Sequence, residues 1–167
     1  FQSLAALPTV VVGLVLYAFL SRSGPLGPMG LLYTPAGVVI GQYFLALPIL
    51  VSFIAAGFRT VDRRFMETLE TFGCGLPLKF VLALREGKTI IAAGVAMAFS
   101  RVIGEVGVAM MLGGNLRNST RTMTTAIALD TSRGEFEQAM ILGLILLFVA
   151  LAVHWLINSR NSRGTLA

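Results

Sequence analysis

The sequence has very little cysteine and histidine. Its 167 residues include one cysteine, Cys74, and one histidine, His154. A lone cysteine excludes an intrachain disulfide, and we expect neither a metal site nor a catalytic triad around the lone histidine. The glycines form neither a GxxxxGKS/T motif nor a GxGxxG motif, so no nucleotide is expected to bind. We therefore predict no catalytic residue, no metal and no cofactor in this chain.

Charge is also scarce. Only 13% of the residues are charged and 56% are hydrophobic, with a mean hydropathy of +0.82, whereas soluble domains carry about a quarter charged residues. The composition predicts an all-α integral membrane protein. The net charge of +5 does not indicate a nucleic-acid partner, because the basic residues fall between apolar runs, as positive-inside topology requires.

Four apolar runs predict a polytopic helix bundle. Ala36–Phe58 is free of charge and long enough to span, with a kink expected at Pro48, and Phe136–Ile157 is the last span. Leu4–Leu20 is only marginally long, since a transmembrane helix needs ~20 residues. The fourth run extends from Thr89 to about Leu112. We treat residues 1–167 as one transmembrane domain and expect at least one further helix upstream.

Two charges interrupt the fourth run. Arg101 and Glu105 are four residues apart, which places them on one face of a continuous helix. Unpaired, each would cost several kcal/mol in hydrocarbon, so both should face protein or water. They form either a structural ion pair or part of a translocation pathway, in which Arg101 draws an anion inward and Glu105 weakens that attraction.

The longest charged interval is Val61–Lys88, between two apolar runs. Phe65, Leu69 and Phe72 recur at helical spacing, which predicts a short amphipathic helix with one apolar face. Gly73 follows where a left-handed residue would end that helix. The loop 59–88 therefore has the form of a docking helix between two spans.

The distribution of basic residues predicts the orientation. The central interval and the C-terminal tail contain most of them, so both are expected in the cytoplasm of a multi-pass protein of the cell membrane. These residues are Arg59, Arg63, Arg64, Lys79, Arg85, Lys88, Arg160 and Arg163, against Arg22, Arg117, Arg121 and Arg133 on the other side.

Residues 113–134 are polar at both ends, with a seven-residue apolar middle that is too short to span. An interfacial or re-entrant turn is expected here, and Ser132 with Glu135 has capping-box spacing before the last span. Hydroxyl and amide groups gather on the outer side. They form either an ordinary exposed loop or a donor-lined entrance for an oxyanion, composed of Asn115, Ser119, Thr120, Thr122, Thr124 and Thr125.

The segment Glu67–Gly73 resembles the EAA loop of ABC importer permeases, with Thr68 and Leu69 in place of the two alanines. Further along, the sequence is similar to the tungstate/molybdate permease family, and most similar to its tungstate branch. The matching stretches are LREGK at 84–88, SRVIGEVGVAMMLGGN at 100–115 and TRTMTTAIALDTSRGEFEQA at 120–139. As in the tungstate branch, Arg85-Glu86 occupies the place where most type I permeases have Leu-Pro.

The resemblance implies a permease subunit of a type I ABC importer that carries an oxyanion, with tungstate expected and molybdate or sulfate as alternatives. It implies a second permease copy, a pair of ATPase subunits that hold ATP–Mg, and an extracytoplasmic oxyanion-binding protein. A coupling helix would dock on the ATPase through Phe65, Glu67, Leu69, Phe72 and Gly73. Without the resemblance, Glu67 and Gly73 could be a solvated helix face and its stop signal. A secondary transporter and a non-transporting membrane anchor are the other classes considered.

Overall fold

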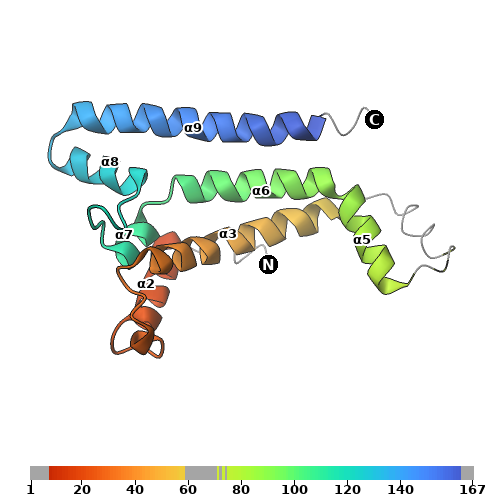
Figure 1. The fold of residues 1–167 in the computed structure, drawn as a ribbon, viewed down its shortest axis with the longest axis horizontal. Coiled ribbons are helices and arrows are strands. Elements are labelled where there is room, and N and C mark those ends of the chain that lie inside the picture. Colours follow the sequence, from red (N-terminus) through yellow and green to blue (C-terminus); the bar gives the residue numbers. More distant parts are fainter. Residues whose placement is uncertain (1–7, 59–70, 72, 74, 163–167) are drawn as a thin grey trace.

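A computed structural model describes residues 8–58, 71, 73 and 75–162. Helices joined by short turns make up these parts of the chain, with no strand among the described residues (Figure 1). The prediction of an all-α membrane fold is therefore confirmed. In order, the elements are α2 (Thr9–Leu20), the 3-10 turn η1 (Gly27–Met29), α3 (Pro35–Phe58), α5 (Leu76–Glu86), α6 (Lys88–Ile103), α7 (Gly107–Gly113), α8 (Met123–Ser132) and α9 (Phe136–Ser162).

Helices α3, α6 and α9 lie side by side along the long axis of the molecule, and α6 packs between the other two (Figure 1). Helix α5 and the C-terminal end of α9 lie at one end of this layer. The short helices α7 and α8 lie at the other end, where α2 and its following loop project away from the layer. Helix α5, a described part of the central interval, thus lies at the same end as the last described turns of α9.

Among the described residues, two helices are long and apolar enough to cross a membrane, at Pro35–Ala56 and Phe136–Ile157. Both confirm predicted spans, and Pro48 lies inside the first. The run predicted from Leu4 is described only from residue 8, where Pro8 precedes the 12-residue helix α2. The apolar middle of 113–134 belongs to the 10-residue helix α8, which is too short to span.

The fourth apolar run is not one continuous helix. Helix α6 ends at Ile103 and α7 begins at Gly107, with a bend of 63° between them. Glu105 therefore lies in the break, and the expectation that it shares a helix face with Arg101 is wrong. The physical reason is that Glu105 is fixed by contacts with the next helix and with another part of the chain, described below.

The core lies where α7 packs between α2 and α3. Leu20, Leu45, Val108 and Leu112 form one buried cluster across these three helices. Close packing depends on glycine: a Cβ at Gly41 would lie 2.5 Å from side-chain carbons of both Val108 and Leu112. The bend after Ile103 thus places α7 against α3 at Gly41. A side chain at position 41 would occupy the space that Val108 and Leu112 fill.

A buried carboxylate at the helix break

Glu105 is the most constrained charged residue in the described part of the chain. Only 5% of it is exposed, and Arg101 donates a hydrogen bond from Nη1 to its Oε2 over 3.0 Å. Its other oxygen, Oε1, accepts from the backbone N–H of Val108 at 3.2 Å. This N–H belongs to the first turn of α7, where backbone donors lack partners within the helix. Glu105 therefore forms an ion pair and stabilises the start of α7 at once.

The backbone of Glu105 is also held on both sides. Its N–H donates to the carbonyl of Val102 at 3.0 Å. Its carbonyl accepts from the hydroxyl of Thr124 in α8, also at 3.0 Å. Because Thr124 is buried and 19 residues away, this bond connects α8 to the break between α6 and α7.

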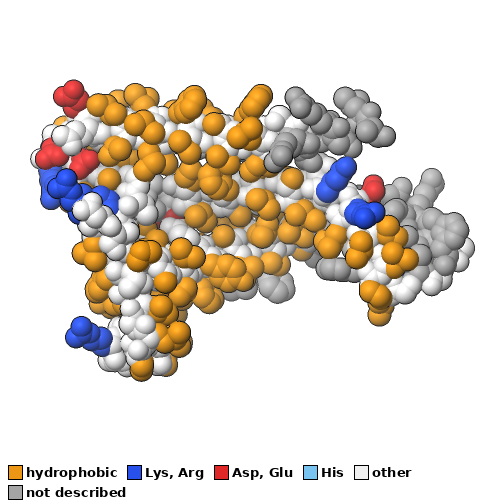
Figure 2. Space-filling model, viewed as in Figure 1, with side chains coloured by type: hydrophobic (Ala, Val, Ile, Leu, Met, Phe, Trp, Pro, Cys, Tyr) orange, Lys and Arg blue, Asp and Glu red, His pale blue; other side chains and the backbone are white. Residues whose placement is uncertain are grey.

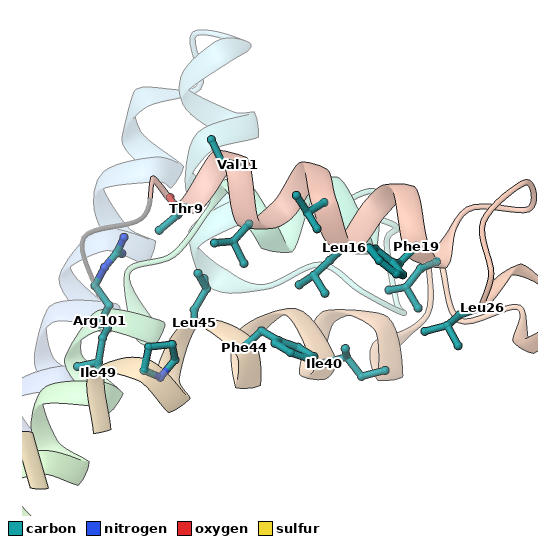
Figure 3. A pocket seen from close by; sticks show the side chains of 14 residues that line it. Thr9, Val11, Leu16, Phe19, Leu26, Ile40, Phe44, Leu45, Ile49 and Arg101 are labelled. Carbon is teal, nitrogen blue, oxygen red and sulfur yellow. The ribbon is translucent and has the colours of Figure 1, made fainter. Parts of the chain in front are cut away.

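Arg101 is less enclosed than its partner, with 44% of its side chain exposed. It lies at the end of a cavity of about 560 Å³ between α2 and α3 (Figure 3). The walls are largely apolar, and Arg101 is the one charged side chain among the described residues that line the cavity. The cavity alone is a poor oxyanion site, since apolar walls cannot replace the water that a dianion loses.

The polar residues of the turn after α7 mostly bond within the chain. The hydroxyl of Thr120 donates to the carbonyl of Gly113 and accepts from the N–H of Leu116 at 3.0 Å. Thr122 and Thr125 form a capping box at the start of α8, in which each side chain bonds the other residue's backbone N–H. The capping box expected at Ser132 and Glu135 is wrong, because α8 still includes Ser132, whose hydroxyl bonds Leu129.

The six residues considered for an oxyanion entrance divide into two groups. Thr120, Thr124 and Thr125 are buried, so an ordinary exposed loop does not describe them. Asn115, Ser119 and Thr122 remain at least partly accessible. Asn115 donates to the carbonyl of Thr125 at 3.4 Å and accepts from Arg121 at 3.2 Å. Hydrogen bonds within the turn thus fix its conformation, and three of the six residues remain accessible. Their contact with an anion stays a prediction.

Of the residues expected to couple to an ATPase, Phe65, Glu67, Leu69 and Phe72 lie outside the described residues. Gly73 is described, and its φ of 64° is the left-handed conformation expected where a helix ends. A Cβ at this position would meet none of the described residues within 4 Å. The backbone conformation by itself disfavours a larger side chain at 73.

The contacts of Tyr33 connect two parts of the chain, and no pattern in the sequence predicted them. Tyr33 has a φ of 62°, and its N–H donates to the carbonyl of Leu112 at 2.7 Å. Its ring lies against Gly114, where a Cβ would come within 2.8 Å of it. Its hydroxyl lies 3.3 Å from that of Tyr17, and this hydrogen bond raises the pKa of Tyr33 above its ordinary value. Tyr33 therefore joins α2 and its loop to the end of α7.

A buried carboxylate paired with an arginine at a broken span, within a bundle of long apolar helices, is typical of a membrane transport protein. Residues 1–162 match the family described as "Binding-protein-dependent transport system inner membrane component". The chain belongs to this family, and it is an integral membrane permease component.

Particular relatives carry more specific names. The chain is 41% identical over 150 residues to the tungstate uptake system permease protein TupB of Campylobacter jejuni, with 89% of this chain and 62% of that protein covered. It is 39% identical over 157 residues to TupB of Peptoclostridium acidaminophilum, covering 94% and 69%. Identity to the molybdenum transport system permease protein ModB of Azotobacter vinelandii is 29% over 178 residues, covering 99% and 79%. The chain thus spans about two thirds of the length of the two tungstate permeases.

Proposed function

We propose that this chain is the permease subunit of an ATP-driven importer and that the oxyanion it carries is tungstate. One observation carries the choice of substrate. Identity to two tungstate permeases from different organisms is 39–41%, whereas identity to a molybdenum permease is 29%, over a similar extent of the chain. Molybdate is the second candidate, because that more distant match still covers 99% of the chain.

The proposed complex contains two copies of the permease, two ATPase subunits and an extracytoplasmic oxyanion-binding protein. ATP–Mg binds to the ATPase subunits, and this chain contributes no catalytic residue. The loop 59–88 and the tail lie in the cytoplasm, where the segment that includes Glu67 and Gly73 docks on the ATPase. The family membership supports the binding protein in this complex, since the family is described as binding-protein-dependent.

Within this proposal, Arg101 and Glu105 have two compatible roles. The buried carboxylate fixes the start of α7, as its bond to Val108 indicates. The half-exposed guanidinium lowers the barrier for a dianion without holding it tightly, because the neighbouring carboxylate offsets its charge. Weak, balanced attraction suits conduction, since an ion that binds strongly does not leave.

Tungstate and molybdate are tetrahedral dianions of nearly the same size, so hydroxyls and amides along a pathway have little to distinguish them. We assign the discrimination to the binding protein, whose enclosed pocket can surround every oxygen with fixed donors. ATP hydrolysis by the reconstituted complex, measured with the binding protein saturated by each anion, tests the assignment. Tungstate is expected to stimulate hydrolysis, and molybdate at equal occupancy nearly as well. Stimulation by the sulfate-loaded protein alone would contradict the tungstate assignment.

A further inference from the structure

Helix α5 has an apolar strip along one side, and its charged residues lie off that strip, with Leu82 on the same side as two of them. Pro77, Val81 and Leu84 recur at intervals of four and three residues, which aligns them along one side of a helix. Lys79 and Glu86 are seven residues apart and lie on the opposite side. A short helix with this division is suited to lie along an apolar boundary and not to cross it.

The described chain leaves this apolar side uncovered. Helix α5 packs against the start of α6 beside the turn at Gly87, and no other described helix makes more than a marginal contact with it. Val81 is 46% exposed and Leu84 37%. Figure 2 shows hydrophobic side chains next to basic ones at the end of the molecule where α5 lies. Such a continuous apolar face marks a contact with a partner or a membrane.

Cations border the same face. Val81, Leu84, Arg85 and Lys88 together line a shallow hollow of about 490 Å³. Arg85 lies in the last turn of α5, and Lys88 opens α6. Apolar side chains are thus beside two positive groups, with the negative Glu86 exposed nearby. A molecule that fits this hollow has a hydrocarbon part and an anionic part.

The position of α5 indicates where such a molecule is found. A single residue, Gly87, separates α5 from α6, which with α7 forms the bent span. Figure 1 shows α5 at the end of the helix layer, turned away from the direction of α6. The membrane surface therefore lies close to the junction, where long basic side chains can reach headgroups while their stems stay in apolar surroundings.

We propose that α5 is an in-plane membrane helix that binds anionic phospholipid. Val81 and Leu84 contact the acyl chains, and Arg85 and Lys88 bind the phosphate of the headgroup. The basic pair favours a lipid over the apolar surface of a second protein, because anionic headgroups supply charge complementarity beside hydrocarbon. Glu86 moderates the attraction. The inference stands apart from the identity of the transported ion.

Site-specific quenching tests this binding in the permease assembled with its partner subunits in lipid nanodiscs. Trp155 is the only tryptophan of the chain; with Trp155→Phe as background, Val81→Trp provides a probe on α5. Brominated phosphatidylglycerol is expected to quench this probe more than brominated phosphatidylcholine at equal mole fraction. Arg85→Gln should reduce the preference about fivefold at low salt, and adding Lys88→Gln should remove it.

Two controls determine what the result means. Leu144→Trp places the same probe on the exposed face of α9, where no preference between the two lipids is expected. Glu86→Gln removes the opposing charge and should increase the preference measured on α5. Leu84→Trp repeats the test should the first probe perturb the helix. Equal quenching by both lipids would overturn the proposal, and so would the absence of quenching at both α5 positions, which would place α5 against protein.

Discussion

The hydroxyl of Thr124 donates a hydrogen bond to the backbone carbonyl of Glu105 over 3.0 Å. This bond joins residues 19 positions apart in the sequence and ends at the break between α6 and α7. Since the carboxylate of the same Glu105 bonds Arg101 and Val108, three segments of the chain meet at one residue. The break is therefore held by the contacts of Glu105 with Arg101, Val108 and Thr124.

Removal of the Thr124 hydroxyl should loosen this junction. Thr124→Val keeps the shape of a buried side chain and leaves the Glu105 carbonyl without its partner. We expect a loss of stability of about 1–3 kcal/mol, the cost of an unsatisfied buried acceptor. Thermal unfolding of the purified protein measures it. Thr131→Val is the matched control, because that hydroxyl is exposed and bonds within its own helix. Equal losses for the two variants would contradict the role of Thr124.

The pairing of Arg101 with Glu105 predicts non-additive substitutions. Glu105→Gln leaves Arg101 without its counter-charge and weakens the start of α7, so the assembled complex should lose stability. Adding Arg101→Gln should recover part of that loss, because residues in contact are energetically coupled. Thermal stability of the three proteins tests the coupling.

Uptake by the same proteins separates the two roles of Arg101. If the double variant assembles well and still fails to transport, the guanidinium serves the anion. If the double variant transports at the unmodified rate, the pair is structural alone.

Packing of α7 against α3 at Gly41 predicts the effect of a single methyl group. Gly41→Ala should destabilise the protein by about 1–3 kcal/mol, because its Cβ would overlap Val108 and Leu112 side chains that are fully buried. Gly143→Ala in α9 is the control, since a Cβ there meets none of the described residues within 4 Å. It should be neutral or stabilising by up to about 1 kcal/mol, as expected for alanine over glycine in a helix. If Gly41→Ala stabilised the protein, Val108 and Leu112 would be able to move away from the added methyl group, and the prediction of tight packing would be wrong.

The long spans could be predicted from the sequence, and the break could not. An uncharged run such as Ala36–Phe58 has no favourable state except a helix in lipid, so composition alone defines α3. The break at Glu105 depends on a contact with Thr124 that no local pattern contains. Helical spacing therefore predicted the correct ion-pair partner of Arg101, although Arg101 and Glu105 do not belong to one continuous helix.

The hydrogen-bond partners of polar residues near the turns could not be predicted from the sequence either. Ser132 has the spacing of a capping residue, yet its hydroxyl bonds Leu129 at 2.6 Å inside α8. The actual capping box joins Thr122 to Thr125, where the third position has a threonine and not the usual glutamate or glutamine. Ser, Thr and Asn bond whichever backbone groups the tertiary fold leaves open, so spacing alone does not identify their partners.

The orientation of the chain is tested by chemical access. In a background with Cys74 replaced, a cysteine at Thr71 should react only with reagents that reach the cytoplasm, and one at Ser119 should react from outside. Both residues are exposed, so labelling is not limited by burial. The excess of basic residues around the central interval is the physical reason for this assignment. Reversed labelling would remove the support for a coupling role of the loop 59–88.

The most direct test of the account is tungstate uptake into proteoliposomes that contain this permease with its ATPase subunits. Tungsten inside the vesicles is measured by mass spectrometry after addition of tungstate-loaded binding protein, with ATP or a non-hydrolysable analogue enclosed. The account predicts accumulation that requires both ATP hydrolysis and the binding protein. Accumulation with sulfate-loaded but not tungstate-loaded protein would contradict the substrate, and accumulation independent of ATP would contradict the importer itself.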